Sequence, residues 1–166
     1  MSSVSSTSAD IYSAPSSHPR PFAAIAVGGL AAGALDLTQA FIGFGLLGAK
    51  PFRILQHIAA GALGPSSFRM GWSSASLGLL FHFTIATTAA TVYYLARRRL
   101  RMLENRPAIS GLLYGEMVFL FMYFVVLPLS PVGPAKFNIA TYITGPVGHP
   151  LLVGLPIALS VRRFGR

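Results

Sequence analysis

The segment between residues 22 and 47 constrains the fold most, because it is apolar and contains a single ionisable residue, Asp36. It is longer than the roughly 20 apolar residues that a helix needs to cross a bilayer. A carboxylate at membrane depth costs roughly 3 kcal/mol or more, so Asp36 should face protein or a watery cavity. The sequence therefore predicts a membrane-spanning helix in which one acid needs a partner.

Three further apolar segments have the same character, in a chain that is 53% apolar and has a mean hydropathy of +0.62. This composition lies outside the range of soluble domains. The four predicted spans are 22–47, 71–95, 107–128 and 138–161. The last contains several prolines and glycines around His149, which predicts a kinked or partly unwound helix.

Residues 51–64 are too short to span and are amphipathic, with Arg53, Gln56 and His57 on one face. Such a segment is typical of a helix in the membrane interface. There Arg53 and His57 either reach toward headgroups or form the mouth of a site below them. The predicted fold is therefore all-α, a four-helix transmembrane bundle with one short amphipathic interfacial helix between the first two spans.

Residues 1–21 are rich in serine and proline, which predicts a disordered cytoplasmic tail ahead of a single membrane domain at 22–166. The apolar run that follows is too long for the core of a signal peptide, so we expect it to persist as a span. The absence of cysteine excludes disulfides, thiolate nucleophiles, iron–sulfur clusters and zinc–thiolate sites.

Small residues recur at helical spacing in the first two spans. In the first they share one side with Asp36, and this pattern lets helices pack closely within a membrane. The residues are Gly29, Ala32, Gly33, Ala40 and Gly43 in the first span, and Gly71, Ala75, Gly78, Ala86 and Ala89 beside His82 in the second. Tyr93 and Tyr94, near the end of the second span, are interpreted as anchors in the interface.

The thirteen basic residues punctuate the apolar runs, nine at one end of a four-span bundle and four at the other. The richer end includes the segment 97–106, and the positive-inside rule places it, with both chain ends, in the cytoplasm.

A net charge of +9 without a basic face does not favour a nucleic-acid partner. The expected partner is the lipid bilayer. Four spans enclose little space for a closed pathway, which is compatible with a homo-oligomer.

Each predicted span carries one ionisable residue: Asp36, His82, Glu116 and His149. All four lie about 11 or 12 positions from the outer ends of their spans, or roughly 17 Å, which is near the bilayer midplane. The interpretation is a polar centre with two proton-sharing pairs, Asp36 with His82 and Glu116 with His149. The polar residues that could extend it are Gln39, Thr84, Thr87 and Tyr114.

Such a centre favours a small transporter or a proton-linked membrane factor. Three alternatives remain open: a divalent metal site, a b-type haem held by His82 and His149, and interhelical hydrogen-bond clamps in a structural or assembly protein. No spacing of metal ligands on one helix supports the metal site. No nucleophile elbow, P-loop or dinucleotide motif is present, so we expect neither an enzyme nor a bound cofactor.

The runs AGALDLTQAF, PFRILQHIAAGALG, LGLLFHFTIATTAATVYYLARRRL and GLLYGEMVFLFMYFVVLPLS occur in an order that resembles small bacterial inner-membrane proteins of unknown function and, distantly, the YagU-type proteins. The resemblance covers about residues 28–163. It implies a multi-pass protein of the bacterial plasma membrane without a settled biochemical activity, and it assigns no site residues.

Overall fold

The computed structural model describes residues 20–100, 102–134 and 139–165. Every regular element within these ranges is helical, so the all-α prediction is confirmed for them. The predicted disordered tail lies outside the described residues except for its last two, Arg20 and Pro21, where the first helix begins.

Among the described residues, three helical segments are long and apolar enough to cross a membrane. They are α1 (Pro21–Gly45), α3 (Trp72–Arg99) and the continuous run Pro107–Leu129. This run consists of α5 (Pro107–Phe121), a π-helical stretch η2 (Met122–Val126) and α6 (Leu127–Leu129). Proline at the first helical position starts two of them, because its missing N–H needs no partner there.

The fourth predicted span corresponds to α7 (Ile139–Ile143), η3 (Thr144–Gly154) and α8 (Leu155–Phe164), which follow one another without a break. The prolines of this segment lack the N–H that an α-helix needs, and η3 is wound as a π-helix around them. The expected irregularity is thus a wider helical winding and not an unwound segment. This run is not among the three candidate spans.

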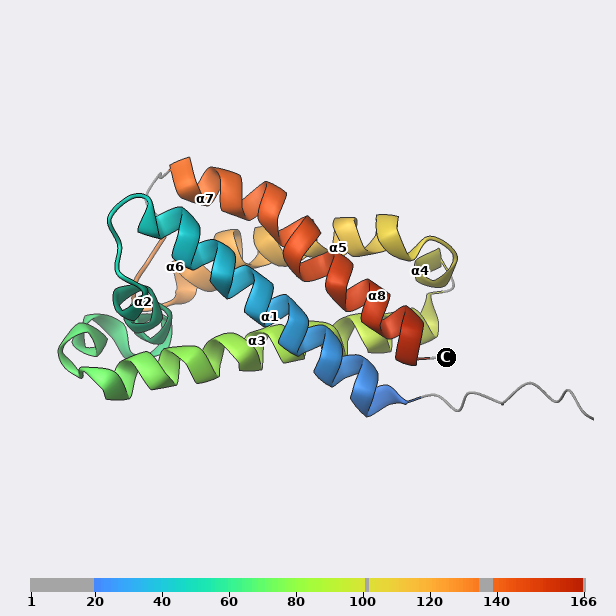
Figure 1. Ribbon diagram of the computed structural model, residues 1–166, viewed down its shortest axis with the longest axis horizontal. Helices are drawn as coiled ribbons and strands as arrows, with labels where there is room; N and C mark the ends of the chain where they lie inside the picture. Colours follow the sequence, from blue (N-terminus) through green and yellow to red (C-terminus); the bar gives the residue numbers. More distant parts are fainter. Residues whose placement is uncertain (1–19, 101, 135–138, 166) are drawn as a thin grey trace, which may run out of the picture.

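Figure 1 shows α1 and the α7–α8 run crossing in front of α3 and α5. Helix α1 contacts α3 on one side and α8 on the other, while α5 packs along η3 and α8. The start of α1 lies beside the end of α8, where the Arg20 N–H donates to the Phe164 carbonyl at 2.8 Å. The short helix α4 (Met102–Asn105) lies at the same end, which we call the basic end.

The small residues of α1 face neighbouring helices, as predicted. Ala32 is fully buried, and a Cβ on Gly29 would meet Thr87 of α3. One turn later, a Cβ on Gly33 would meet the ring of Phe83. Glycine at these positions therefore allows α1 and α3 to approach closely.

The buried core lies in the half of the bundle nearest the basic end. It includes Ala24, Ala90, Tyr93, Tyr94, Ile157 and Val161. The interpretation of Tyr93 and Tyr94 as interface anchors is wrong, because both rings are buried against other helices. The Tyr93 hydroxyl pairs with Ser110 Oγ of α5 at 2.8 Å, which satisfies both buried groups.

Helix α2 (Pro51–Leu63) lies at the opposite end, the α2 end, where Figure 1 shows it nearly end-on across the bundle. It continues into a 3₁₀ turn, η1 (Gly64–Arg69). Gln56 is fully buried and donates to the carbonyls of Ser67 and Gly71 and to Ser74 Oγ, each at 3.2 Å. The Gln56 amide thus holds α2 against the start of α3. It is buried, although the sequence placed it with Arg53 on the polar face of an interfacial helix.

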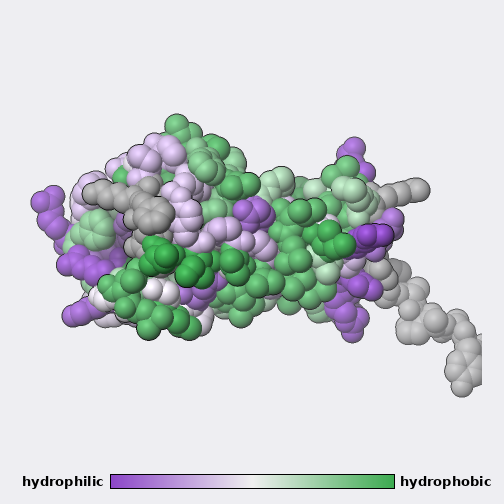
Figure 2. Space-filling view, turned by 90° about the horizontal axis from the view of Figure 1, so that it is seen from above, coloured by the Kyte–Doolittle hydropathy of each residue, from purple (hydrophilic) through white to green (hydrophobic). Residues whose placement is uncertain are grey.

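The surface between the two ends is largely apolar. Figure 2 shows the most hydrophilic residues mainly at both ends of the long axis, with hydrophobic residues and residues of intermediate hydropathy between them on the face drawn. Large apolar side chains such as Leu80, Leu113 and Phe124 are exposed there. Together with the three candidate spans, this surface indicates contact with a lipid bilayer and a multi-pass membrane protein.

Candidate membrane cavity

A cavity of about 730 Å³ opens in the half of the molecule near the α2 end. Helices α1, α2, α5 and α6 and the π-helical η3 line it, together with His82 of α3 and residues 132–134 of the following loop. Most of its wall is apolar or aromatic, from Phe44, Ile54, Phe119, Met122, Tyr123 and Leu127. A largely apolar cavity with a few polar groups is typical of a binding site for a small molecule.

Three of the four residues of the predicted polar centre line this cavity: Asp36, His82 and His149. They come from α1, α3 and η3, and they lie at one level of the bundle. His82 contacts the carbonyl of Gly33, one turn before Asp36, and Asp36 in turn faces His149. These three side chains form a polar part of the cavity lining, which we call the cavity floor.

Asp36 Oδ1 lies 3.9 Å from His149 Nδ1, and each side chain is 21% exposed. This distance is longer than a hydrogen bond, so the contact is an ion pair that forms when the imidazole is protonated. Asp36 makes no hydrogen bond to any residue that the structure describes. The carboxylate therefore keeps its acceptor capacity, although it lies at membrane depth.

His82 Nε2 lies 2.8 Å from the Gly33 carbonyl oxygen. A carbonyl only accepts, so Nε2 carries the hydrogen and donates. In the neutral ring this leaves Nδ1 as an acceptor. The ring also stands edge-on to Phe83, with 5.6 Å between the ring centroids.

Glu116 lies at a comparable level but does not line the cavity. Gly115, directly before it on α5, packs against the carbonyl of His149. Within the described ranges Glu116 forms no hydrogen bond or ion pair. The structure therefore pairs the four residues differently from the prediction: Asp36 faces His149, His82 binds a backbone carbonyl, and Glu116 stays apart.

Of the polar residues expected to extend the polar centre, one lines the cavity and the others do not. Gln39 lines the cavity, and its amide occupies the space that a Cβ on Gly148 would need. Thr84 is exposed on the outside of α3, and its hydroxyl donates to the Leu80 carbonyl of its own helix at 2.8 Å. Thr87, which the sequence also suggested, packs against Gly29.

Tyr114 belongs to the buried half near the basic end. Its hydroxyl donates to the Ala89 carbonyl at 2.7 Å, and its ring lies 5.0 Å from that of Tyr93. It therefore joins α5 to α3 below the cavity floor and does not extend the cavity.

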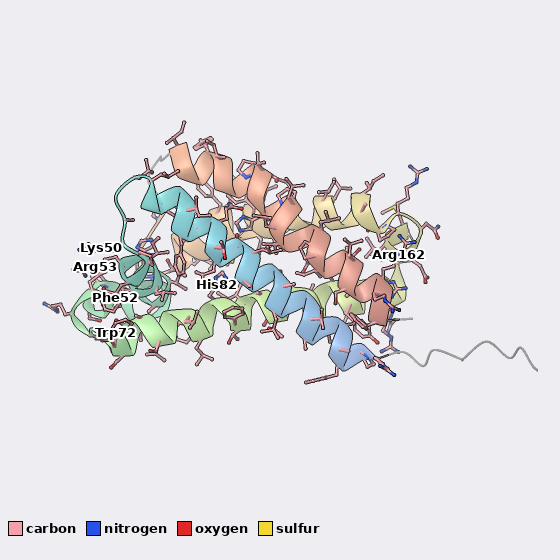
Figure 3. The ribbon with its side chains drawn as sticks, in the orientation of Figure 1. Lys50, Phe52, Arg53, Trp72, His82 and Arg162 are labelled. Carbon is pink, nitrogen blue, oxygen red and sulfur yellow. The ribbon has the colours of Figure 1, made fainter. Side chains whose placement is uncertain are left out.

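Arg53 and His57 of α2 line the cavity at its α2 end. Figure 3 shows Arg53 at that end and His82 farther along the bundle. Arg53 Nη1 donates to Gln56 Oε1 and to the Phe68 carbonyl, both at 3.1 Å, and its guanidinium lies 5.9 Å from the Phe68 ring centroid. Both residues are exposed and line the cavity, and the two positions that the sequence allowed for them stay predictions.

The aromatic and aliphatic wall of α5, η2 and α6 was not singled out by the sequence analysis. Phe119, Met122, Tyr123 and Leu127 recur every three or four positions, so they share one helical face. That spacing is a signal of a common neighbour, but it does not distinguish a cavity from a packed core.

Within the described ranges, no three His, Asp or Glu residues converge closely enough to hold a metal ion. The haem prediction needs ring nitrogens that are free to ligate, and His82 Nε2 is engaged by the Gly33 carbonyl. Of its ring nitrogens only Nδ1 is left for an iron. Haem ligation by His82 and His149 stays a prediction.

Comparisons with known proteins add no assignment to this geometry. No family model matches the chain, and neither does any curated protein or solved structure. The resemblance to YagU-type proteins therefore stays a prediction, and the function has to be argued from the cavity itself.

Proposed function

We propose that this protein is a small four-span transporter of the bacterial inner membrane, with both chain ends in the cytoplasm and the cavity open to the outside. The fourth span would be the helical run Ile139–Phe164, which packs along α1 and α5. The basic end carries seven described arginines against three basic residues at the α2 end, which supports this orientation.

The observation that carries the proposal is the state of Asp36. It is the one acid that lines the cavity, it lies at membrane depth, and it accepts no hydrogen bond from the described residues. A membrane protein that needed only stability would satisfy such a group with donors. An ionisable group that keeps its acceptor capacity in an apolar cavity supports a binding role.

The chemistry of the floor indicates the class of ligand. Asp36 and the neutral His82 ring supply acceptors, and the walls are apolar, so the complementary solute is a small apolar molecule with an ammonium group. His149 faces the same carboxylate, with Nδ1 3.9 Å from Asp36 Oδ1. A ligand ammonium that reaches Asp36 would therefore lie beside the His149 ring.

Three probes with the same ring test this proposal in purified protein: benzylamine, benzyl alcohol and benzoate. At saturation benzylamine should raise the melting temperature by about 3 °C, because a ligand bound only to the folded state stabilises it. Benzyl alcohol and benzoate should raise it far less. Equal shifts with all three probes would overturn the ligand class.

Two variants locate the effect. Asp36→Asn should abolish the benzylamine shift, whereas Thr84→Val, on the outer surface of the neighbouring helix, should keep it. His149→Gln should still bind benzylamine, because Asp36 supplies the binding group. Retention of the benzylamine shift in Asp36→Asn would show that the carboxylate is not the binding group.

A further inference from the structure

A second concave site lies at the basic end, about 850 Å³ in volume, where α3 and α8 end beside α4. Arg97, Arg98 and Arg162 line it, together with Tyr94 and Glu104. Figure 3 shows Arg162 at this end, far from the labelled residues of the α2 end. The site is separate from the membrane cavity and shares no lining residue with it.

The charges in this site are not balanced internally. Arg97 is fixed, with Nη1 donating to the Val161 carbonyl and Nη2 to Glu104 Oε1, both at 2.9 Å, and its side chain is only 9% exposed. Glu104 is the one acid among the lining residues, and Arg97 already neutralises it. Arg98 and Arg162 form no hydrogen bond or ion pair with described residues. Two guanidinium groups are thus left to face an anion.

The surface next to this site has the chemistry of a lipid tail. Leu95 is 52% exposed one turn before Arg98 on α3, and Leu159 is 45% exposed one turn before Arg162 on α8. Residues three apart lie on the same side of a helix, so each arginine has an exposed leucine on its membrane side. A bound phosphate would therefore have room for acyl chains along α3 and α8.

We propose that this site binds the phosphate of one anionic phospholipid. A guanidinium binds phosphate oxygens with two parallel hydrogen bonds, and Arg98 and Arg162 approach from two different helices. The lipid would join the ends of α3 and α8, which contact each other little elsewhere. The proposal names specific arginines and thus goes beyond a general attraction of basic loops to anionic membranes.

The chain offers a matched control for this proposal. Arg99 and Arg163 directly follow Arg98 and Arg162 on the same helices, and both are exposed but do not line the site. The double variants Arg98→Gln with Arg162→Gln and Arg99→Gln with Arg163→Gln remove the same charge. All four side chains are exposed, so both variants should keep the melting temperature of the unmodified protein.

Native mass spectrometry of the purified chain, titrated with phosphatidylglycerol or phosphatidylcholine, measures the binding. We expect one tightly bound phosphatidylglycerol, weakened about tenfold or more in the Arg98/Arg162 variant and less than about twofold in the control. Replacement of the pair by lysine should retain part of the affinity. Equal losses in the two glutamine variants, or no loss in either, would overturn the proposal.

A second arm separates the lipid from a soluble anion. Glycerol 3-phosphate and inorganic phosphate, added at the concentrations that saturate phosphatidylglycerol, should not displace it, because they lack the acyl chains that Leu95 and Leu159 would contact. Displacement at equal concentration would show a site for a soluble phosphate and overturn the assignment to a lipid.

Discussion

The two halves of this bundle are built from the same helices but differ in how their polar groups are used. In the half near the basic end, Tyr93 and Ser110 are buried, Tyr114 is partly buried, and all three form hydrogen bonds between α3 and α5. In the half near the α2 end, Asp36 faces a cavity without a hydrogen bond to any described residue. The polar groups of the half near the basic end are hydrogen-bonded between helices, and we call it the closed half. The half near the α2 end keeps a charged group in contact with a cavity, and we call it the open half.

The difference follows from which residues meet between the helices. Toward the basic end glycine meets small partners, as where Gly154 packs against the backbone of Gly111. Toward the α2 end, large side chains such as Phe44 and Phe119 line the cavity, and Phe119 packs against Gly145 of η3. The backbones of α5 and the fourth helical run thus meet closely at Gly154, whereas the large side chains near the α2 end surround a cavity.

The most damaging change should be Gly154→Ala in the closed half. The added Cβ would overlap the Gly111 carbonyl oxygen and crowd the backbone of Gly115, and no flexible side chain is there to move. We expect a loss of about 3 kcal/mol or more in the free energy of unfolding. Fluorescence-detected size-exclusion chromatography after heating should show a much lower yield of folded protein.

Gly61→Ala is the matched control, because nothing lies within 4 Å of a Cβ at that position of α2. Alanine should leave stability unchanged or raise it by up to about 1 kcal/mol, since glycine is unfavourable within a helix. Equal behaviour of the two variants would mean that the closed half is not closely packed at Gly154.

The second prediction compares the accessibility of the two halves. The chain has no cysteine, so single alanine-to-cysteine variants give a clean background. Ala40 lines the cavity, whereas Ala90 is fully buried in the closed half, so Ala40→Cys and Ala90→Cys place one thiol in each half. A charged, membrane-impermeant thiol reagent added from outside should modify Ala40→Cys on the order of 100-fold faster, the factor that an opening cost of about 3 kcal/mol imposes.

Faster modification of Ala90→Cys from the cytoplasmic side would show that the molecule is open inward under the conditions used. Equal rates from the outside would contradict the division into an open and a closed half. Leu113→Cys, on the lipid-facing surface, should react slowly with a charged reagent from either side and serves as the control.

The sequence predicts the parts of this architecture that depend on composition and period. The apolar runs predicted α1, α3 and α5 to α6 as spans, and the small residues around Gly33 predicted which side of α1 contacts other helices. Pro51 at the start of α2 and Gly64 directly after its end are residues typical of helix ends. These features are local, so they can be recognised without knowledge of neighbouring helices.

The partners of the polar residues could not be predicted in the same way. Four ionisable residues at one depth allow several pairings, and the actual one depends on how each helix is rotated about its axis. The contact of Gly115 with the His149 backbone and of Gly33 with Phe83 sets those rotations. They bring His149 to Asp36, turn His82 toward a carbonyl, and leave Glu116 outside the cavity.

The third prediction concerns a satisfied polar group of the closed half. Tyr114→Phe removes the hydroxyl that donates to the Ala89 carbonyl but keeps the ring against Tyr93. We expect a loss of about 1 kcal/mol in stability, the usual contribution of such a hydrogen bond. Binding of benzylamine should not change, because Tyr114 does not line the cavity. Loss of binding without loss of stability would extend the site into the closed half.

The smallest effect should distinguish a hydrogen bond between helices from one within a helix. Ser160 Oγ of α8 donates to the Ala24 carbonyl of α1 at 2.9 Å and is buried, whereas the exposed Thr84 hydroxyl donates to Leu80 on its own helix. Ser160→Ala should lower the free energy of unfolding by about 0.6 kcal/mol, the average for interhelical hydrogen bonds in membranes.

Thr84→Val is the control. It keeps the shape of the side chain and loses only the hydrogen bond within its own helix, so the free energy of unfolding should change by less than about 0.3 kcal/mol. Thermal unfolding of the two variants in the same detergent measures this difference. If Thr84→Val were the more destabilising, Thr84 would have to contact another helix, and the lipid-facing position that separates it from the cavity would be wrong.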